Sequence, residues 1–331
     1  MKVAIVGTGL QFKRRMSGLD PEKDQLVGVA FFTKSKSKLY PKNQSIYFAD
    51  WKKCIDESGA EAIIVCTPPH LHKKIVYYAL NNNKHVLCEK PMTQLSDDAK
   101  YLFQLAKKKK KILKCGFNHR HHPGLKLTKE LIKRKSFGKL LFARCVYGIN
   151  GRKNYFKEWR ANKKFSAGGQ FIEQGIHLID LLIWFIGNPI KISLSTSNIV
   201  NKKQSLEESG MAVLKFENHV TASIHTSLTQ WDNRFNFEIY GENQYVEISG
   251  LAGSYGNQKV KLGTKKSKGP FEYKYFDFRS SDVSWSNEWK HFKSAIKGKT
   301  KLIGNGHDAY KAMRVAEHAY KSEINLKKIK Y

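Results

Sequence analysis

Three ionisable side chains interrupt an otherwise apolar stretch near the middle of the sequence. Glu173, His177 and Asp180 follow one another at spacings of four and three residues within the stretch 166–187. In a helix these spacings place all three side chains on one face. A carboxylate one turn away from an imidazole fixes its tautomer, which suits a general base working near neutral pH. The pattern indicates a proton-transferring group, with a set of satisfied polar groups in the core as the alternative.

The stretch that carries these residues has recognisable helix boundaries. Gly168 and Gly169 open it, and Gly187 followed by Pro189 closes it, which is a typical helix stop. Almost every other residue in between is apolar, so the helix should be buried nearly all round. The glycine pair should let another backbone or a ligand approach closely. The sequence therefore predicts one buried helix over 166–187.

A glycine turn follows the first apolar run of the chain, residues 2–6. A helical stretch comes next, and a strand, a tight turn and a helix in this order predict a dinucleotide site with the pyrophosphate at the helix N-terminus. Phe12 stands where a third glycine is usual, which affects helix packing rather than phosphate approach. The basic residues at 13–15 could supplement the amides or lie in solvent. We expect the cofactor to contact Gly7, Thr8, Gly9, Leu10 and Gln11.

The tip of the second expected strand bears on the choice between NAD and NADP. An NAD-specific unit places an acid there to hold the ribose 2′-hydroxyl. Here the sequence reads Thr33-Lys34-Ser35-Lys36, with no acid within reach. Hydroxyls and lysines favour a 2′-phosphate, so we expect Thr33 and Lys34 to bind NADP, with NAD as the alternative.

Apolar strands alternate with helices through the first third of the chain. The expected strands are 2–6, 26–32, 47–48, 62–67, 85–89 and 112–118, and the expected helices between them include 51–57, 73–81 and 96–108. This alternation is typical of a doubly wound parallel sheet, whose ligands bind at the carboxyl ends of the strands. Lys90 follows one of these ends and is held by Pro91. We expect it to point toward the nicotinamide, with an ordinary surface lysine as the alternative.

Beyond residue 190 the pattern changes to short strands separated by turns. The expected strands are 191–199, 211–216, 220–226, 235–240, 245–248 and 271–278, followed by helices at 287–296 and 308–321. Such a series is typical of an antiparallel meander. We therefore expect an α/β protein with an N-terminal Rossmann domain over 1–119 and a C-terminal α+β domain over 120–331, built on a large, mostly antiparallel open sheet.

Composition limits the classes of partner. The 331 residues carry a formal charge of +31, but lysine supplies 49 of the 59 basic side chains and they are spread along the chain. We therefore expect attraction to anionic small molecules rather than nucleic-acid binding. Five widely spaced cysteines fit reduced thiols. With no secretory pattern and no apolar run long enough to span a bilayer, we expect a cytoplasmic protein without a membrane partner.

Taken in order, five motifs resemble those of the Gfo/Idh/MocA oxidoreductases, the glucose-fructose oxidoreductase and inositol dehydrogenase family. They are Thr67-Pro68-Pro69-x-x-His72, His85-Val86-Leu87-Cys88-Glu89-Lys90-Pro91, Gly116-Phe117-Asn118-His119-Arg120, Trp159-Arg160 and Glu173-x-Gly175-x-His177-x-x-Asp180. The resemblance is close over the first 190 residues and holds in outline beyond them. It implies a nucleotide-binding domain followed by an α/β domain whose open sheet mediates homo-oligomers.

The resemblance also implies roles for single residues. Lys90 corresponds to the catalytic lysine, His177 to the base, and Glu173 to an acid that is usually Asp in the family. Arg120 would join these three at the substrate, and the Lys90-Pro91 region would be a tight turn with a cis bond. The implied cofactor contacts are Thr67, Pro68, His72, Glu89, Lys90, Asn118, Trp159 and Arg160.

Three histidines close together, His119, His121 and His122, raise the question of a metal ion. A metal site usually needs carboxylate or thiolate help in a defined geometry, and Arg120 among the histidines disfavours a cation. We expect no metal.

The sequence thus predicts hydride transfer between a nicotinamide cofactor and a secondary alcohol or ketone of a sugar, sugar nucleotide or cyclitol. Two alternatives stay open. One is a glycosidase or epimerase that oxidises its substrate transiently and keeps its cofactor bound. The other is a regulatory protein that senses a sugar or a cofactor without catalysis.

Overall fold

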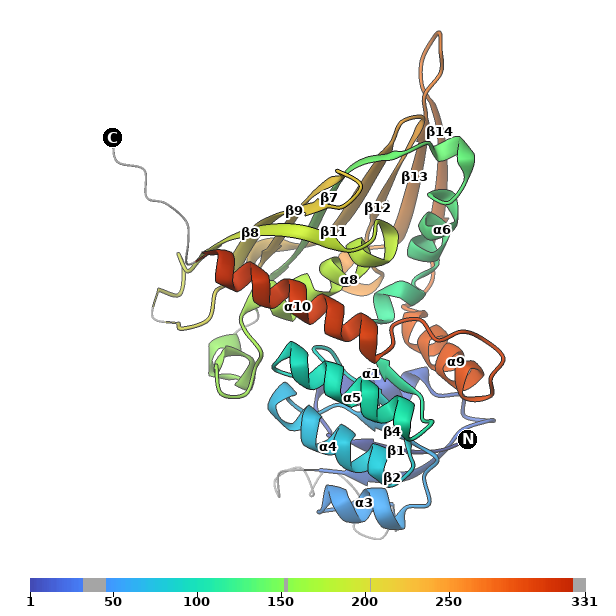
Figure 1. Ribbon diagram of the computed structural model, residues 1–331, viewed down its shortest axis with the longest axis vertical. Helices are drawn as coiled ribbons and strands as arrows, with labels where there is room; N and C mark the ends of the chain where they lie inside the picture. Colours follow the sequence, from blue (N-terminus) through green and yellow to red (C-terminus); the bar gives the residue numbers. More distant parts are fainter. Residues whose placement is uncertain (32–45, 152–153, 203, 324–331) are drawn as a thin grey trace. The chain divides into compact units, whose positions relative to one another are not determined.

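The computed structural model describes residues 1–31, 46–151, 154–202 and 204–323 (Figure 1). The chain divides into two compact units. The first comprises Met1–Asn118 together with Val283–Tyr310, and the second comprises His119–Asp282 together with the chain from Lys311 onward. The expected division into 1–119 and 120–331 did not include the return of a late segment to the first unit.

The first unit contains a six-stranded parallel sheet in the order β3-β2-β1-β4-β5-β6. Its strands are β1 (Lys2–Val6), β2 (Gln25–Ala30), β3 (Tyr47–Phe48), β4 (Ala62–Val65), β5 (His85–Cys88) and β6 (Leu113–Cys115). The predicted doubly wound parallel sheet is confirmed. Four of the six predicted strands run past the observed carboxyl ends by one to three residues, because the chain leaves the sheet there to form the loops of the expected ligand edge.

The helices of the first unit are α1 (Leu10–Gly18), α3 (Trp51–Glu57), α4 (Pro69–Asn81), α5 (Ser96–Lys108) and α9 (Ser284–Ile296). The bounds of α5 agree with the prediction. Asp97 and Asp98 in its first turn stabilise the helix, because their negative charges lie at the positive end of the helix dipole. Helix α4 begins four residues before the predicted start. Pro69 occupies its first turn, where the missing amide costs nothing.

Both faces of the parallel sheet are buried, and helix α9 completes one of them. Val3 and Ile5 of β1 lie in a core cluster with Trp289 and Phe292 of α9, and Phe12 of α1 packs against the same cluster. Without the return segment, this face would expose apolar side chains to water. The N-terminal sequence therefore does not contain the whole core of its own sheet.

The second unit contains an eight-stranded sheet in the order β14-β13-β12-β11-β7-β10-β9-β8. Its strands are β7 (Leu140–Asn150), β8 (Pro189–Ser197), β9 (Ser209–Phe216), β10 (Thr221–Ser227), β11 (Thr229–Gly241), β12 (Gln244–Ser249), β13 (Gln258–Thr264) and β14 (Glu272–Phe278). The pairs are antiparallel except for β7 and β10, which are parallel. The predicted mostly antiparallel sheet is confirmed, but the prediction missed β7 and β13.

Helices α6 (Pro123–Leu131), α7 (Gln170–Glu173) and α8 (Gly175–Phe185) pack against the eight-stranded sheet. Helix α10 (Gly306–Glu323) continues from the first unit into the second. Short 3-10 turns complete the described elements: η1 (Asn118–His121), η2 (Lys135–Phe137), η3 (Tyr155–Lys157), η4 (Trp159–Ala161) and η5 (Gly253–Tyr255). Within the described ranges, no helix combines the length and the apolar character needed to cross a membrane.

Candidate active site

The glycine turn after β1 has the shape that a dinucleotide requires. Gly7 has a φ of +106°, and a Cβ atom on it would lie 2.8 Å from the carbonyl carbon of Cys66. Only glycine fits there. Gly9 is the N-cap of α1, and a Cβ atom on it would meet nothing within 4 Å. The space in front of the helix N-terminus is therefore open on the side of Gly9.

Two buried polar atoms near this turn are consistent with a ligand-binding site. Gln11 Oε1 and Thr67 Oγ1 are buried and have no hydrogen-bond partner among the described residues. Buried polar atoms are nearly always bonded, so these two fit contacts to a bound group. Together with the amides at the start of α1, they suit the phosphates and ribose of a dinucleotide. Thr33 and Lys34, the expected contacts of the 2′-phosphate, lie outside the described residues.

Replacing Gly9 by alanine separates the folding role of the turn from its role in binding. We expect the free energy of unfolding to change by less than about 1 kcal/mol, because the weaker N-cap and the stiffer unfolded chain offset each other. The added methyl group would occupy the space where a pyrophosphate approaches, so the Kd for the nicotinamide cofactor should rise roughly 10-fold or more. Urea unfolding and fluorescence titration measure the two effects. A variant with unchanged cofactor affinity would contradict the phosphate site.

The segment around Lys90 lies at the carboxyl end of β5, and the Lys90–Pro91 peptide bond is cis, as the resemblance implied. Two residues that were expected to bind cofactor, Glu89 beside Lys90 and His72 of α4, are engaged by protein groups. The Glu89 carboxylate accepts a hydrogen bond from Arg15 at 2.7 Å. The His72 ring nitrogens lie 2.9 Å from the Pro91 carbonyl oxygen and 2.7 Å from that of Thr67.

Two other expected contacts of the first unit also have defined surroundings. Pro68 forms the N-cap of α4. Asn118 is buried and donates a hydrogen bond from Nδ2 to Ser284 Oγ at 2.9 Å. Since Ser284 begins α9, the return segment helps to fix the loop that follows β6.

In the second unit, the predicted helix over 166–187 is in fact two helices. Helix α7 ends at Glu173, and α8 begins at Gly175 after an irregular residue, Gln174, whose φ is −109°. The prediction of one continuous helix was wrong here. Its C-terminal boundary is confirmed, because Gly187 has a φ of +125° and follows the last turn of α8.

The glycine pair before α7 allows another backbone to approach closely, as predicted. A Cβ atom on Gly169 would lie 2.4 Å from the carbonyl oxygen of Glu207. The Glu207 carboxylate accepts hydrogen bonds from the amide of Phe171 at 3.1 Å and from the hydroxyl of Tyr320 at 2.6 Å. Burial raises the pKa of Glu207, and these hydrogen bonds limit the rise. This side chain therefore holds the N-terminus of the helix that carries Glu173.

The Glu173 carboxylate, the expected acid, accepts a hydrogen bond from Arg160 Nε at 3.3 Å. The same guanidinium also contacts Glu158 through Nη1 at 3.2 Å and lies 4.4 Å from the centre of the Trp159 ring. The adjacent Trp159 and Arg160 were expected at the cofactor or substrate. In the second unit they form one cluster with the acid.

His177 is buried, and its ring stacks on that of His119, with the ring centres 3.9 Å apart and the planes inclined by 21°. Tyr147 and Phe235 pack around His119 at ring-centre distances of 5.3 and 5.8 Å. The sequence marked His119 as part of a motif and as one of three neighbouring histidines, but its ring stack with His177 was not predicted. A parallel ring limits how the imidazole of His177 can rotate.

Asp180, the third ionisable residue of the apolar stretch 166–187, belongs to a buried ion pair. Arg120 donates to both of its carboxylate oxygens, at 2.8 Å from Nε and 2.7 Å from Nη2, and both side chains are almost fully buried. The geometry is that of a bidentate pair. Arg120 was expected at the substrate, whereas this bond gives its guanidinium a structural partner. Asp180 therefore fits the alternative of a satisfied core group.

No three His, Cys, Asp or Glu side chains in the described ranges are grouped as a metal site would require. All five cysteines are buried and free of disulfide bonds. Burial raises the pKa of the Cys54 thiol to about 12. This shift disfavours the reactive thiolate form at that position.

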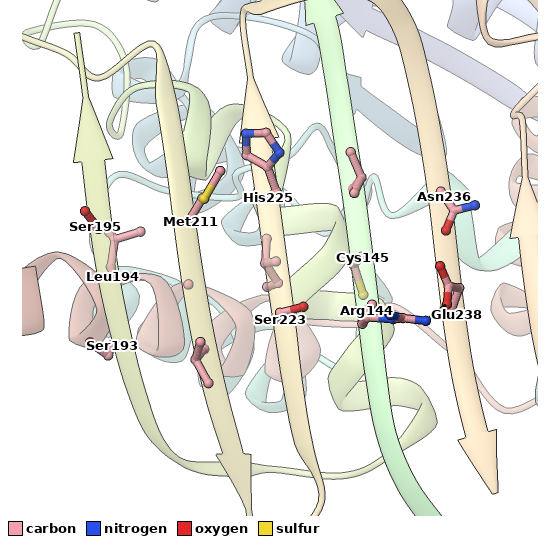
Figure 2. Close-up of a pocket in the computed structure, with 14 residues that line it drawn as sticks. Arg144, Cys145, Ser193, Leu194, Ser195, Met211, Ser223, His225, Asn236 and Glu238 are labelled. Carbon is pink, nitrogen blue, oxygen red and sulfur yellow. Dashed lines mark hydrogen bonds and ion pairs between the residues drawn. The ribbon is translucent and has the colours of Figure 1, made fainter. Parts of the chain in front are cut away.

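A hollow of about 550 Å³ lies elsewhere, on the face of the eight-stranded sheet shown in Figure 2. Residues from β7 to β11 line it, among them Met211, His225 and Glu238, which binds Arg144 at 2.6 Å. None of the residues that the sequence predicted for the active site lines this hollow. The hollow is therefore lined by other residues than those of the candidate active site.

Comparison with known proteins gives matches over both units. Residues 1–117 match the family described as an oxidoreductase family with an NAD-binding Rossmann fold. Residues 125–247 match the GFO/IDH/MocA C-terminal domain. The two matches together cover more than half of the chain.

Among curated relatives, glucose-6-phosphate 3-dehydrogenase of Bacillus subtilis is 29% identical over 260 residues, which cover 73% of each protein. Levoglucosan dehydrogenase of Pseudarthrobacter phenanthrenivorans is 25% identical over 232 residues, which cover 62% of this chain but only 57% of that relative. A solved structure of levoglucosan dehydrogenase in complex with NADH matches 98% of this chain and 97% of that chain, with a TM-score of 0.85 at 17% identity. This last likeness concerns the fold alone.

Proposed function

The chain belongs to the Gfo/Idh/MocA family of NAD(P)-dependent oxidoreductases, and from this membership we propose that it transfers a hydride between a nicotinamide cofactor and a CH–OH or C=O group of a carbohydrate. The substrate class is a sugar, a sugar nucleotide or a cyclitol. The proposal is supported by relatives whose names include glucose-6-phosphate 3-dehydrogenase and levoglucosan dehydrogenase.

The observation that carries the proposal is the edge of the parallel sheet in the first unit. There, the glycine turn, the buried Thr67 hydroxyl and the start of the Lys90 segment follow the carboxyl ends of β1, β4 and β5. In such sheets, ligands bind at this edge. Its groups suit a dinucleotide, and in the proposed reaction Lys90 acts at the nicotinamide end of that cofactor. NADP is the favoured cofactor because of the Thr33-Lys34 segment, with NAD as the alternative.

The chain's own residues have these roles in the proposal. The nicotinamide, when bound, supplies the redox chemistry by accepting or donating a hydride. The Lys90 ammonium donates a hydrogen bond to the reacting oxygen and stabilises its developing negative charge. The His177 imidazole accepts the proton of the reacting hydroxyl at a ring nitrogen. Glu173, held by Arg160, supplies negative charge that favours the protonated imidazole.

A thermal-shift panel followed by turnover assays tests the proposal. We expect NADP or NAD to raise the melting temperature, since a ligand that binds only the native state stabilises it. Sugars, sugar nucleotides and cyclitols are then screened for a change in nicotinamide absorbance. Product formed without net absorbance change would indicate transient oxidation with retained cofactor. Cofactor binding without any turnover would indicate a sensor.

We also propose that the face of the eight-stranded sheet opposite the helices joins copies of the chain. Side chains on this face include Met211 and Val213, which are 58% and 53% exposed. An aromatic row lies on strands β7, β11 and β12, which β10 separates from these two residues: the Phe142 and Tyr240 rings stack at 4.5 Å, and the Tyr240 and Tyr245 rings stack at 4.8 Å. Exposed apolar and aromatic groups of this kind are typical of protein interfaces.

Light scattering on the purified protein and on a Met211→Glu, Val213→Lys double variant tests this surface. We expect a dimer or larger assembly for the natural chain and a smaller species for the variant, because charges at the centre of an interface must be desolvated. A monomeric natural chain would rule the surface out as a self-association site without affecting the proposed reaction.

A further inference from the structure

We infer that His72 and Arg15 are positioning residues that fix the segment of Lys90 from its two sides. The inference rests on the proposed function, in which the Lys90 ammonium contacts the reacting oxygen. It departs from the expectation that His72 and Glu89 bind cofactor. All groups that carry it lie in the first unit.

Arg15 fixes the residue before Lys90. Its Nε donates to Glu89 Oε1 at 2.7 Å, and its Nη1 donates to Glu288 Oε2 at 2.5 Å. The guanidinium also lies 4.7 Å from the centre of the Trp285 ring. Arg15, Glu89 and Glu288 are each no more than 3% exposed. The arginine therefore joins the helix after the glycine turn, the end of β5 and the return helix α9.

Charge balance and space both fit this network. Lys114 Nζ lies 3.3 Å from Glu288 Oε1, so two buried cations face two buried carboxylates. Burial alone would lower the pKa of Arg15, but Glu89 and Glu288 hold it above its ordinary value. A Cβ atom on Gly116 would lie 2.6 Å from Arg15 Nη2. The glycine after β6 thus leaves room for the guanidinium.

His72 fixes the residue after Lys90. Its Nδ1 lies 2.9 Å from the carbonyl oxygen of Pro91, and its Nε2 lies 2.7 Å from that of Thr67. The ring is 1% exposed. Burial lowers its pKa to about 4, and the two carbonyl groups limit that shift. A neutral imidazole carries one N–H, so it donates to one of these two carbonyl oxygens and packs against the other. In this way the ring ties the segment after β5 to the end of the neighbouring strand β4.

The need for two anchors follows from the lysine side chain itself. Its ammonium stands on a flexible four-carbon stem, so its position depends on how firmly the backbone below it is held. A shift of about 1 Å in a reacting group can cost roughly 100-fold in rate. Because Glu89 and His72 already bond to protein atoms, they are suited to hold Lys90 rather than to hold cofactor.

The first experiment compares His72→Gln and Arg15→Lys with Lys293→Met. Lys293 also lies on α9, where it binds Asp24 at 2.8 Å, so its loss should lower the melting temperature without touching the Lys90 segment. We expect His72→Gln and Arg15→Lys to lower kcat roughly 10-fold or more while the Kd for cofactor stays within about twofold. Arg15→Lys should retain more activity than Arg15→Met, because one charge-assisted hydrogen bond to Glu89 can still form.

A second measurement does not depend on turnover. The full-length protein is labelled with trinitrobenzene sulfonate, and the modification of Lys90 and of the exposed Lys74 is followed by mass spectrometry. His72→Gln and Arg15→Lys should change the labelling rate of Lys90 at least twofold and leave that of Lys74 unchanged, even if no sugar is oxidised. Variants with the Lys90 reactivity and kcat of Lys293→Met would overturn the inference. Loss of cofactor affinity instead would make these residues cofactor contacts.

Discussion

Lys90→Met and His177→Ala are each expected to lower turnover by roughly 10²-fold or more while cofactor affinity stays nearly unchanged. Methionine keeps the length of the lysine stem but removes the hydrogen-bond donor and the charge that would stabilise the reacting oxygen. Alanine at position 177 removes the imidazole that would accept the proton. Initial rates give kcat and KM, and nicotinamide fluorescence gives the Kd for cofactor. The double variant should lose little more than either single one, because the proposed reaction has both groups acting on the same oxygen.

Matched controls separate chemistry from stability. Lys74→Met removes an exposed lysine of α4, and His318→Ala removes an exposed histidine of α10. Neither should alter kcat by more than about twofold, because neither residue belongs to the proposed site. Their effect on stability should also be small, about 0.5 kcal/mol, as is usual for surface substitutions. If Lys90→Met or His177→Ala abolishes cofactor binding, the residue holds the cofactor or the fold rather than the reacting oxygen. If either keeps full turnover, the proposed roles are wrong.

Asp180→Ala is expected to lower the free energy of unfolding by about 3–5 kcal/mol, because it leaves the Arg120 guanidinium buried without its bidentate partner. Urea denaturation measures the loss. An Arg120→Met, Asp180→Leu double variant should recover most of it, since replacing both charges by apolar groups removes the uncompensated charge.

The exposed ion pair between Glu130 and Lys133 on α6 provides the comparison for this result. Their atoms are 2.8 Å apart, but both side chains are more than half exposed, so Glu130→Ala should lower the free energy of unfolding far less than Asp180→Ala does. If Asp180→Ala gives no cooperative transition at all, Asp180→Asn keeps the shape and one acceptor and allows the measurement. A cost below about 1 kcal/mol for both Asp180 variants would show that the buried pair contributes little to stability.

Features that depend on residues close together in the sequence were predicted correctly, and features that depend on residues far apart were not. Helix α5 agrees with the prediction because its capping charges and apolar spacing lie within its own residues. The parallel sheet was predictable for the same reason, since strands and helices alternate locally. Strand β7 was missed, although it lies at the centre of its sheet. Its pairing with β10 was not visible in the local sequence, because β10 comes much later in the chain.

The features of the candidate site also fall into those set by short spacings in the sequence and those set by tertiary packing. The sequence alone determined the glycine turn, the position of Lys90 after a strand, and the placement of His177 and Asp180 in one helix. These depend on residue types at fixed short spacings, which local geometry converts directly into shared faces and strand ends.

Only the tertiary structure decided which partner each of these side chains has. In the folded chain Asp180 forms an ion pair with Arg120, and the His119 ring stacks on that of His177. Glu288 forms an ion pair with Arg15, although 273 positions separate the two residues in the sequence. The tertiary structure also placed α9 over the N-terminal sheet and interrupted the predicted helix at Gln174. Such choices follow from the packing of segments distant in sequence, because a buried charge takes whichever partner the fold brings within hydrogen-bond distance.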